Sequence, residues 1–311
     1  MTQCDLNIII ILFNSNKYLI DCIQSYINTG ISLDANHIFI NNGIEEIGSI
    51  YEPLKKLKFK FHQLPLNLGF AKANNIGAGL GNADYLCFLN PDTIITEDFF
   101  TPIIKFIKNN PQAGACAPML TYENGEYQNS SGSRTGLFFE FLEAFFLIGI
   151  FRLFFRKKIE KLKSQYKPVK TGWLSAACLL IKRDIFHKVG GFSEDYFLNY
   201  EDIDLCRKIE NAGYTNYYFP GYKCIHLDHK SFDSDFELLV YSRYESKLIY
   251  SKIHYSLFSG FLTRIFHITG LILRILTVKF LYNRIESKSR LKGYIKAIKL
   301  YSGILTRNSN N

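Results

Sequence analysis

The segment Tyr85–Asp92 joins a short apolar run to a carboxylate that could hold a metal ion. The run Tyr85–Leu89 is typical of a buried strand, and Pro91 ends it because proline has no N–H to donate to a neighbouring strand. Ligands of open α/β sheets bind beyond the carboxyl ends of the strands. Asp92 is therefore well placed to hold a hard cation that carries phosphate oxygens. The alternative is that Asp92 caps the helix that follows it.

Two adjacent acids, Glu201 and Asp202, follow the aromatic stretch Tyr196–Tyr200. Aromatic rings can stack on a sugar, and a partly desolvated carboxylate has a raised pKa and accepts a proton more readily. From Glu201 onward the apolar spacing is helical, so both acids could instead interact with the dipole of that helix. Because both acids lie between the hydrophobic residues Tyr200 and Ile203, we favour a role in proton transfer over interaction with the helix dipole.

Polar turns also follow the other predicted strands, which are residues 6–13, 37–40 and 223–226. Residues 17–28 and 68–80 have the apolar spacing of helices, and residues 59–62 are a further short strand, so predicted helices alternate with predicted strands. This order predicts a mostly parallel α/β sheet whose polar turns share one edge, around a crevice of nucleotide size. His226 is the last residue of its predicted strand, and Asp92 likewise lies just beyond the end of a strand. His226 could be a metal ligand or an ordinary polar residue.

The loop from Asn67 to Gly77 is rich in small residues, so a ligand or a strand could approach its backbone closely. Asn67 and Asn75 present both donors and acceptors. The alternative is a helix start with Asn67 as its cap. No Gly-x-Gly-x-x-Gly follows the first strand and no P-loop lysine is present, so ordinary dinucleotide and triphosphate sites are unsupported.

The remaining patterns predict a hairpin at 121–128 with Asn124-Gly125 at its turn, a strand at 173–182, and strands at 216–219 and 223–226 separated by Pro220-Gly221. Residues 137–155 are very aromatic but carry charges and are too short to span a bilayer. A basic stretch follows at 156–163. The insertion at 137–170 could be an interfacial helix, a lid or an ordinary core helix.

The net charge of +9 is concentrated at the C-terminus. Residues 257–311 contain ten Lys or Arg and one acid, Glu286, an excess equal to that of the whole chain. This argues against a general nucleic-acid binder and favours contact between this basic C-terminal region and an anionic surface. The helical segment 257–281 has an apolar face with Arg264, His267 and Arg274 opposite, which favours a helix in the headgroup plane of an anionic leaflet. A helix covering the catalytic domain is the alternative.

The seven cysteines show no paired metal spacing, and several lie within apolar runs. Residues 1–5 do not resemble a cleavable signal sequence, so we expect a reduced, cytoplasmic setting.

Taken together, these stretches resemble glycosyltransferase family 2, an inverting family with the GT-A fold, and within it the rhamnosyltransferase-like branch. The resemblance covers residues 6–252, leaving 253–311 as a basic, amphipathic, membrane-associating helical tail. It rests on the motifs at 67–77, at 89–93 and at 190–205, and on His226 with Ser231 five positions later. These motifs occur in the order and spacing of that branch.

The resemblance implies a GT-A, Rossmann-like domain and a role for each site residue. Asp92 is expected to hold Mg²⁺ or Mn²⁺ on the donor diphosphate, with His226 either completing the metal site or contacting the diphosphate. Asp202 is placed as the general base that deprotonates the acceptor hydroxyl, and Glu201 as its supporting neighbour. The nucleotide-sugar site is assigned to Phe13, Asn14, Asn41, Asn67, Gly69, Asn75 and Asn90, and the acceptor side to Trp173, Glu194 and Tyr200.

The expected activity is inverting transfer of a rhamnose-like deoxysugar or a hexose from a dTDP- or UDP-linked donor. The expected acceptor is a lipid-linked or polysaccharide hydroxyl of a surface glycan such as O-antigen or capsule, at the inner face of the cell membrane. The chain departs from the family at Asn41 and Ser193, where Asp is usual, and at Ala176, where Gly is usual. The first two departures support a rival, a degenerate GT-A domain that binds glycan or acts as a scaffold. A sugar-1-phosphate nucleotidyltransferase would need a glycine- and arginine-rich signature, which residues 13–16 lack.

Overall fold

A computed structural model describes residues 6–31, 34–44, 54–150, 166–228, 236–281 and 284–303. The chain divides into two compact units. The first, here called the sheet unit, comprises Met1–Arg134, Ile159–Glu194 and Glu201–Ser231. The second, the helical unit, comprises Thr135–Lys158, Asp195–Tyr200 and Phe232–Asn311.

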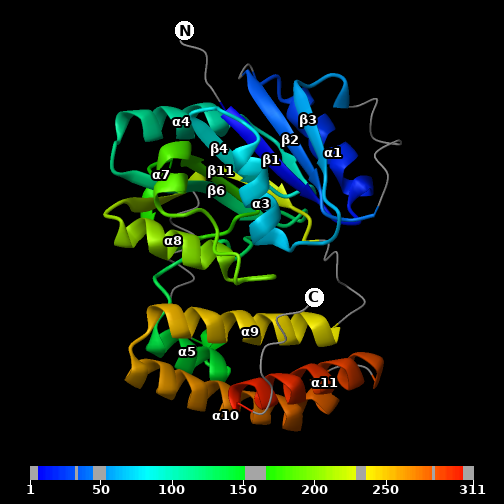
Figure 1. Cartoon of the computed structure of the whole chain (residues 1–311), viewed down its shortest axis with the longest axis vertical. Coiled ribbons are helices and arrows are strands. Elements are labelled where there is room, and N and C mark those ends of the chain that lie inside the picture. The colour runs from blue at the N-terminus through cyan, green and yellow to red at the C-terminus, as the bar shows by residue number, and fades with distance from the viewer. Residues whose placement is uncertain are drawn as a thin grey trace. The chain divides into compact units, whose positions relative to one another are not determined.

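Four parallel strands form the first half of the main sheet (Figure 1). They are β1 (Leu6–Leu12), β2 (Ala35–Asn41), β3 (Phe59–Gln63) and β4 (Tyr85–Leu89), in the spatial order β3-β2-β1-β4. Every residue of β1 is buried, as expected for a strand with covered faces on both sides. The strands predicted at these four places are confirmed, and so is the common edge formed by their carboxyl ends.

The second half of the sheet is mixed. β10 (Cys178–Lys182) runs antiparallel between β4 and β6 (Ala113–Thr121), and β11 (Thr215–His226) runs parallel to β6. Two short strands, β5 (Thr93–Ile95) and β8 (Val169–Thr171), lie antiparallel to β11. The predicted mixed, mostly parallel sheet is therefore confirmed.

Two strand predictions were wrong in detail. The segment 173–182 is not one strand: β9 (Trp173–Leu174) pairs with β7 (Ser131–Gly132) in a separate small sheet, and β10 begins only at Cys178. Conversely, β11 continues through Pro220-Gly221, where the sequence predicted a turn between two strands. A shift in register between Phe219 and Lys223 places the proline at an irregularity, where its missing N–H costs no ladder bond.

Helices cover both faces of the sheet (Figure 1). α1 (Asn16–Asn28) and α4 (Phe100–Asn109) pack in one apolar core, and α3 (Phe70–Gly79), α7 (Arg183–Lys188) and α8 (Glu201–Asn211) pack in the other. Alternate residues of β1 point into the two cores, Ile8 and Ile10 into the first and Ile9 into the second. Gly77 explains the small-residue pattern of α3, because a Cβ there would lie 2.5 Å from Ile9 Cγ2.

The helical unit contains α5 (Leu137–Ala144), α9 (Phe236–His254), α10 (Leu257–Leu281) and α11 (Arg284–Tyr301). Its own core includes Tyr244 of α9, Leu271 of α10 and Ala297 of α11. The boundary expected at residue 252 therefore falls inside a helix that packs with the C-terminal helices. Within the described ranges, residues Leu257–Val278 are the one segment whose length and composition would allow it to cross a membrane. The basic stretch 156–163 lies outside the described residues.

Candidate active site

Asp92 and His226 are brought together by strand pairing. β5 starts directly after Asp92 and pairs antiparallel with the end of β11, which places Thr93 opposite His226. The backbone N–H of Leu227 also donates to the carbonyl oxygen of Asp92, at 3.0 Å. The carboxylate Oδ1 of Asp92 consequently lies 3.3 Å from His226 Nε2, and both side chains are largely buried. The sequence pointed to both residues separately, and the structure places them side by side.

Gln128 holds the other nitrogen of His226. Its side-chain oxygen lies 2.8 Å from His226 Nδ1, and because an amide oxygen only accepts, Nδ1 carries the proton of the neutral ring. Nε2 is then an acceptor, and the amide of Asn90 approaches it at 3.2 Å. Gln128 was missed in the sequence, where nothing marks it beyond its place at the end of the hairpin at 121–128.

The residues around Asp92 fit a divalent metal that takes part of its coordination from a ligand. One carboxylate, one imidazole with an unprotonated nitrogen and one amide oxygen can be supplied by Asp92, His226 and Asn90. Mg²⁺ and Mn²⁺ commonly accept few protein ligands when phosphate oxygens and water fill the remaining positions. Among the residues that the structure describes, no group of three or more His, Cys, Asp or Glu side chains could hold a metal alone. Ser231, the partner of His226 in the predicted motif, lies outside the described residues.

The carboxylate of Asp202 is fixed at the start of α8. It accepts hydrogen bonds from the backbone N–H of Ile203, at 2.8 Å, and of Ala176, at 3.3 Å. The next residue, Ala177, accepts from the backbone N–H of Asn90 at 2.9 Å. The segment between β9 and β10 therefore links the Asp202 carboxylate, through two backbone hydrogen bonds, to Asn90 in the turn that carries Asp92, and both acids belong to one edge of the sheet.

The two acids of α8 differ in environment. Glu201 is buried, with its Oε2 unpaired among the described residues, whereas Asp202 is partly exposed. Burial raises the pKa of Glu201 above its usual range, and the neighbouring charge of Asp202 adds to that. Burial also raises the pKa of Asp202, but its backbone N–H donors oppose the rise by favouring the carboxylate. Glu201 thus holds its proton to higher pH, and Asp202 is the acid that can be ionised and receive a proton.

The residues predicted to bind nucleotide follow β1 and β2 at the same edge. Asn14 has a left-handed backbone, with φ of 51°, and a Cβ on Gly43 would come within 3.4 Å of it, so the two turns touch. The Asn41 amide donates to Gln63 Oε1 at 2.7 Å and is buried. Phe13 lies beside Asn14 and is partly exposed.

Asn42 joins these turns to the loop before α3, a role the sequence did not reveal. Its amide donates to Asn67 Oδ1 at 2.9 Å and to the carbonyl of Gly69 at 3.3 Å, and its oxygen accepts from Leu68 N–H at 2.8 Å. Gly69 has a φ of 81°, a conformation that favours glycine. Asn67 and Gly69 are thereby held at the sheet edge next to the end of β2.

Asn75 is occupied by the loop that leads toward α8. Its amide group donates to the carbonyl of Phe192 at 2.8 Å and to Glu194 at 3.2 Å, and its oxygen accepts from Phe192 N–H at 2.9 Å. Lys72 approaches the same Glu194 carboxylate at 3.5 Å. These contacts explain Asn75 and Glu194 as residues that hold the 191–194 loop against α3, and their predicted contacts with donor and acceptor stay predictions.

The other two predicted acceptor residues belong to different units. Trp173 belongs to β9, where its indole covers Gly132, since a Cβ on that glycine would lie 2.6 Å from Nε1. Tyr200 belongs to the helical unit, is buried, and packs edge-on against Tyr250 with ring centroids 5.6 Å apart. Its backbone φ of 70° is left-handed and directly precedes Glu201.

Comparison with known proteins identifies the family of this chain. Residues 7–190 match the family described as Glycosyl transferase family 2, which is more than half of the chain. The chain belongs to this family. The matched region carries the strands β1 to β10, Asp92 and the 67–77 loop.

Two curated relatives are 30% identical to this member of the family. One is the rhamnosyltransferase WbbL of Escherichia coli, over 168 residues, and the other is the N-acetylglucosaminyl-diphospho-decaprenol L-rhamnosyltransferase of Mycobacterium tuberculosis, over 177 residues. These alignments cover 52% and 51% of this chain and 61% and 56% of the relatives, so the chain spans little more than half of their length. The rhamnosyltransferase-like resemblance is confirmed.

Solved structures confirm the GT-A fold. A mannosyltransferase of Pyrobaculum calidifontis in complex with GDP-mannose and Mn²⁺ aligns with a TM-score of 0.59 and 13% identity, covering 95% of this chain and 86% of that one. GalNAc-T7 with UDP, GalNAc and Mn²⁺ aligns with a TM-score of 0.56 and 13% identity, covering 79% of this chain and 50% of that one.

Proposed function

We propose that this family 2 glycosyltransferase is a metal-dependent, inverting enzyme that moves a rhamnose-like deoxysugar or a hexose from a nucleoside-diphosphate donor to a glycan hydroxyl. The single observation that carries the proposal is the connection of the Asp92–His226 pair to Asp202 through Ala176 and Ala177. Such a transfer needs a site for the donor diphosphate, the role proposed for Asp92 and His226, and a proton acceptor for the incoming hydroxyl, the role proposed for Asp202.

In the proposed reaction, Asp202 takes the proton of the acceptor hydroxyl as its oxygen attacks the anomeric carbon. The bond from that carbon to the donor diphosphate breaks, and the nucleoside diphosphate leaves with the bonding electrons. Attack from the face opposite the leaving group inverts the anomeric centre. A Mg²⁺ or Mn²⁺ ion held by Asp92 and His226 would supply neutralising charge for the diphosphate. Glu201 supports Asp202 by remaining protonated beside it, so that only one negative charge is buried there.

The donor site is proposed along the turns that the structure joins at this edge. Phe13, Asn14 and Asn41 would contact the base and ribose, because the turns after β1 and β2 touch. Asn67, Gly69, Asn75 and Asn90 would extend the site toward Asp92. The donor is proposed to be a dTDP- or UDP-linked sugar.

The acceptor is proposed to be lipid-linked or a growing surface polysaccharide, such as O-antigen or capsule. The printed name of the M. tuberculosis relative describes transfer to a sugar carried on decaprenyl diphosphate, which supports this class of acceptor. Trp173, Glu194 and Tyr200 stay the proposed acceptor residues. The proposed location is the inner face of the cell membrane, where such acceptors are available in the cytoplasm.

The rival reading as a degenerate scaffold rests on Asn41 and Ser193. Ser193 is well integrated, because its hydroxyl donates to the buried carboxylate of Asp204 and accepts from Lys208 at 3.0 Å. This departure keeps the 190–194 loop bonded to α8 and removes no group assigned to proton transfer or metal binding.

Transfer assays on Asp202→Asn, with Glu201→Gln as a matched control, test the proton acceptor. Losing a general base costs about 10²- to 10⁴-fold in rate, so Asp202→Asn should lose transfer by that factor with donor binding retained. Glu201→Gln resembles the protonated acid and should lose much less. Transfer that survives Asp202→Asn unchanged would refute the assignment.

Calorimetric titration with a nucleoside diphosphate and Mn²⁺ tests the metal role. Asp92→Ala should abolish the Mn²⁺-dependent part of binding. Unchanged binding would count against the site. A screen of dTDP- and UDP-linked sugars by thermal stabilisation, with and without Mn²⁺, would identify the donor.

A further inference from the structure

Helix α10 exposes an apolar face. Phe258, Phe261 and Leu276 keep 71%, 60% and 64% of their surface exposed. Ile265 and Ile272, also exposed, complete a series at intervals of three, four and seven residues, which places all five on one side of the helix. A soluble helix normally turns such a face inward.

Helix α5, which packs beside α10, also exposes aromatic side chains. Phe138 and Phe141 are exposed on one side of α5. Phe141 also packs edge-on against Phe266 of α10, with ring centroids 5.4 Å apart, so the exposed side of α5 lies beside α10. We call this surface the aromatic face; it consists of Phe138, Phe141, Phe258, Phe261, Ile265, Ile272 and Leu276.

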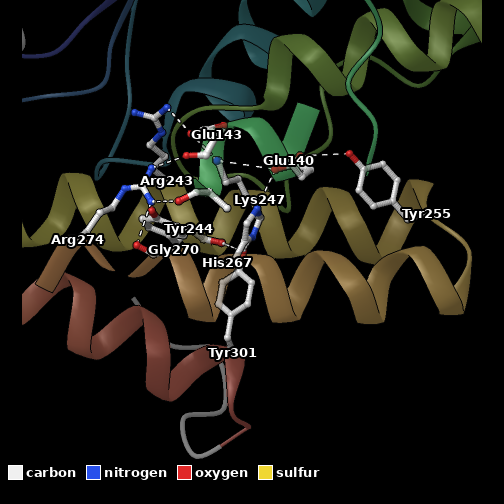
Figure 2. Close-up of polar contacts among 11 residues, drawn as sticks. Glu140, Glu143, Arg243, Tyr244, Lys247, Tyr255, His267, Gly270, Arg274 and Tyr301 are labelled. Carbon is white, nitrogen blue, oxygen red and sulfur yellow. Dashed lines mark hydrogen bonds and ion pairs between the residues drawn. The ribbon is translucent and has the colours of Figure 1, made fainter. Parts of the chain in front are cut away.

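The polar sides of α5 and α10 point into the helical unit, where their side chains form hydrogen bonds and ion pairs with one another and with α9 (Figure 2). Lys247 of α9 places Nζ 2.6 Å from Glu143 and 3.9 Å from Glu140, and the side chains of Lys247 and Glu140 are almost fully buried. His267 of α10 places Nε2 2.8 Å from Glu140, and Arg274 donates to the carbonyl oxygen of Glu143 at 2.8 Å. The sequence placed His267 and Arg274 opposite the apolar residues, which is correct, but they face α5 and α9 rather than the headgroups of a membrane.

This arrangement suits contact with lipid. A helix beside hydrocarbon gains nothing from water, so its polar groups must find partners within the protein, as His267 and Arg274 do. An exposed apolar surface built from two helices is also a feature of membrane and protein interaction sites. Because Thr263, His267 and Leu271 are buried within the helical unit, only one side of α10 is available to lipid, which favours a helix lying at the interface over one that spans.

We infer that the aromatic face is a docking surface for the acyl region of a membrane that contains anionic lipid. The neighbouring helix α11 supplies matching charge, since Lys288, Lys292 and Lys299 are exposed and spaced on one of its sides. A second copy of the chain is the less suitable occupant, because residues 257–311 carry ten basic residues against one acid and two such segments would repel. The inference rests on the proposed function only in that a membrane-bound acceptor makes such docking useful.

Vesicle flotation of the full chain tests the inference with two vesicle compositions, phosphatidylcholine alone and phosphatidylcholine with phosphatidylglycerol. The wild type should float with the anionic vesicles. Phe258→Ser with Phe261→Ser should weaken that binding by about tenfold or more, because two exposed aromatic side chains no longer enter the lipid. Leu66→Ser changes an equally exposed apolar residue of the sheet unit and should leave flotation unchanged. Lys288→Glu with Lys292→Glu should weaken binding to the anionic vesicles only.

Three results would overturn the inference: a wild type that does not float, a double phenylalanine variant that floats as the wild type does, or a variant that alters only the oligomeric state. The last would identify a second copy as the occupant. Circular dichroism should show an unchanged fold, since the substituted residues are exposed. Calorimetric binding of a nucleoside diphosphate with Mn²⁺ by the same proteins reports on the sheet unit, so a failure of the proposed glycosyl transfer is distinguished from a failure of docking.

Discussion

Replacing Lys247 by methionine should destabilise the helical unit strongly. The Lys247 side chain is 2% exposed and its ammonium lies 2.6 Å from Glu143, which is itself 14% exposed. Methionine keeps most of the volume and removes the charge, so Glu140 and Glu143 remain buried with fewer partners. Removing one partner of a buried ion pair costs on the order of 3–5 kcal/mol, because the remaining charge is uncompensated.

Arg243→Met is the matched control, because Arg243 contacts the same carboxylate of Glu143 at 2.9 Å but its side chain is 60% exposed. Solvent screens that pair, so the expected cost is about 0–1 kcal/mol. Urea unfolding followed by circular dichroism at the helical band would measure both. Equal losses for the two variants would refute the reasoning that burial, rather than the ion pair itself, sets the energy.

The pH dependence of the Lys247→Met effect has a defined sign. Burial alone would raise the pKa values of Glu143 and Glu140, but Lys247, together with Arg243 at Glu143 and His267 at Glu140, outweighs it and holds both below their usual range. In the wild type these acids therefore stabilise the fold above their unfolded pKa, and that contribution is lost as pH falls through the lower folded value. In the variant both acids lose the charge of Lys247, so their protonated forms are favoured more than in the wild type. The stability difference should be largest near neutral pH and should shrink as pH falls toward 4, the region of an unperturbed Glu at about 4.3.

Three further outcomes are expected. Gln128→Leu should weaken Mn²⁺ affinity by about 10- to 100-fold, with Gln128→Glu retaining most of it, and ring ¹⁵N shifts of His226 in the metal-free protein should report a lost tautomer preference only in the leucine variant. Asn75→Ala should speed amide hydrogen exchange at Phe192; a large loss of donor binding without faster exchange would instead indicate direct contact with the donor. The apparent pKa of the acidic limb in the pH profile of kcat/KM should be higher than the pKa of about 3.9 of an ordinary aspartate, because burial raises the pKa of Asp202. An apparent pKa at or below that of an ordinary aspartate would contradict the assignment.

Much of the sheet unit could be predicted from the sequence because the relevant signals are local. Continuous apolar runs ended by Asn-rich turns identified β1, β2 and β4, and the spacing of apolar residues identified α10 over its whole length. The order of strands and helices then placed the polar turns at one edge. Local patterns were less informative where pairing decided the outcome, as at Pro220, which β11 accommodates by a shift in register against β6.

Only the tertiary structure decided which side chains meet. Gln128 and His226 are 98 positions apart, and their contact fixes the tautomer of a candidate metal ligand. The sequence could show that α10 has an apolar side and a polar side, but not which of them faces inward. That choice depends on Glu140, which lies 127 positions from His267 and supplies a buried partner for it. Helical periodicity is a property of neighbouring residues, whereas burial of a charged group is decided by a distant partner that compensates for its lost hydration.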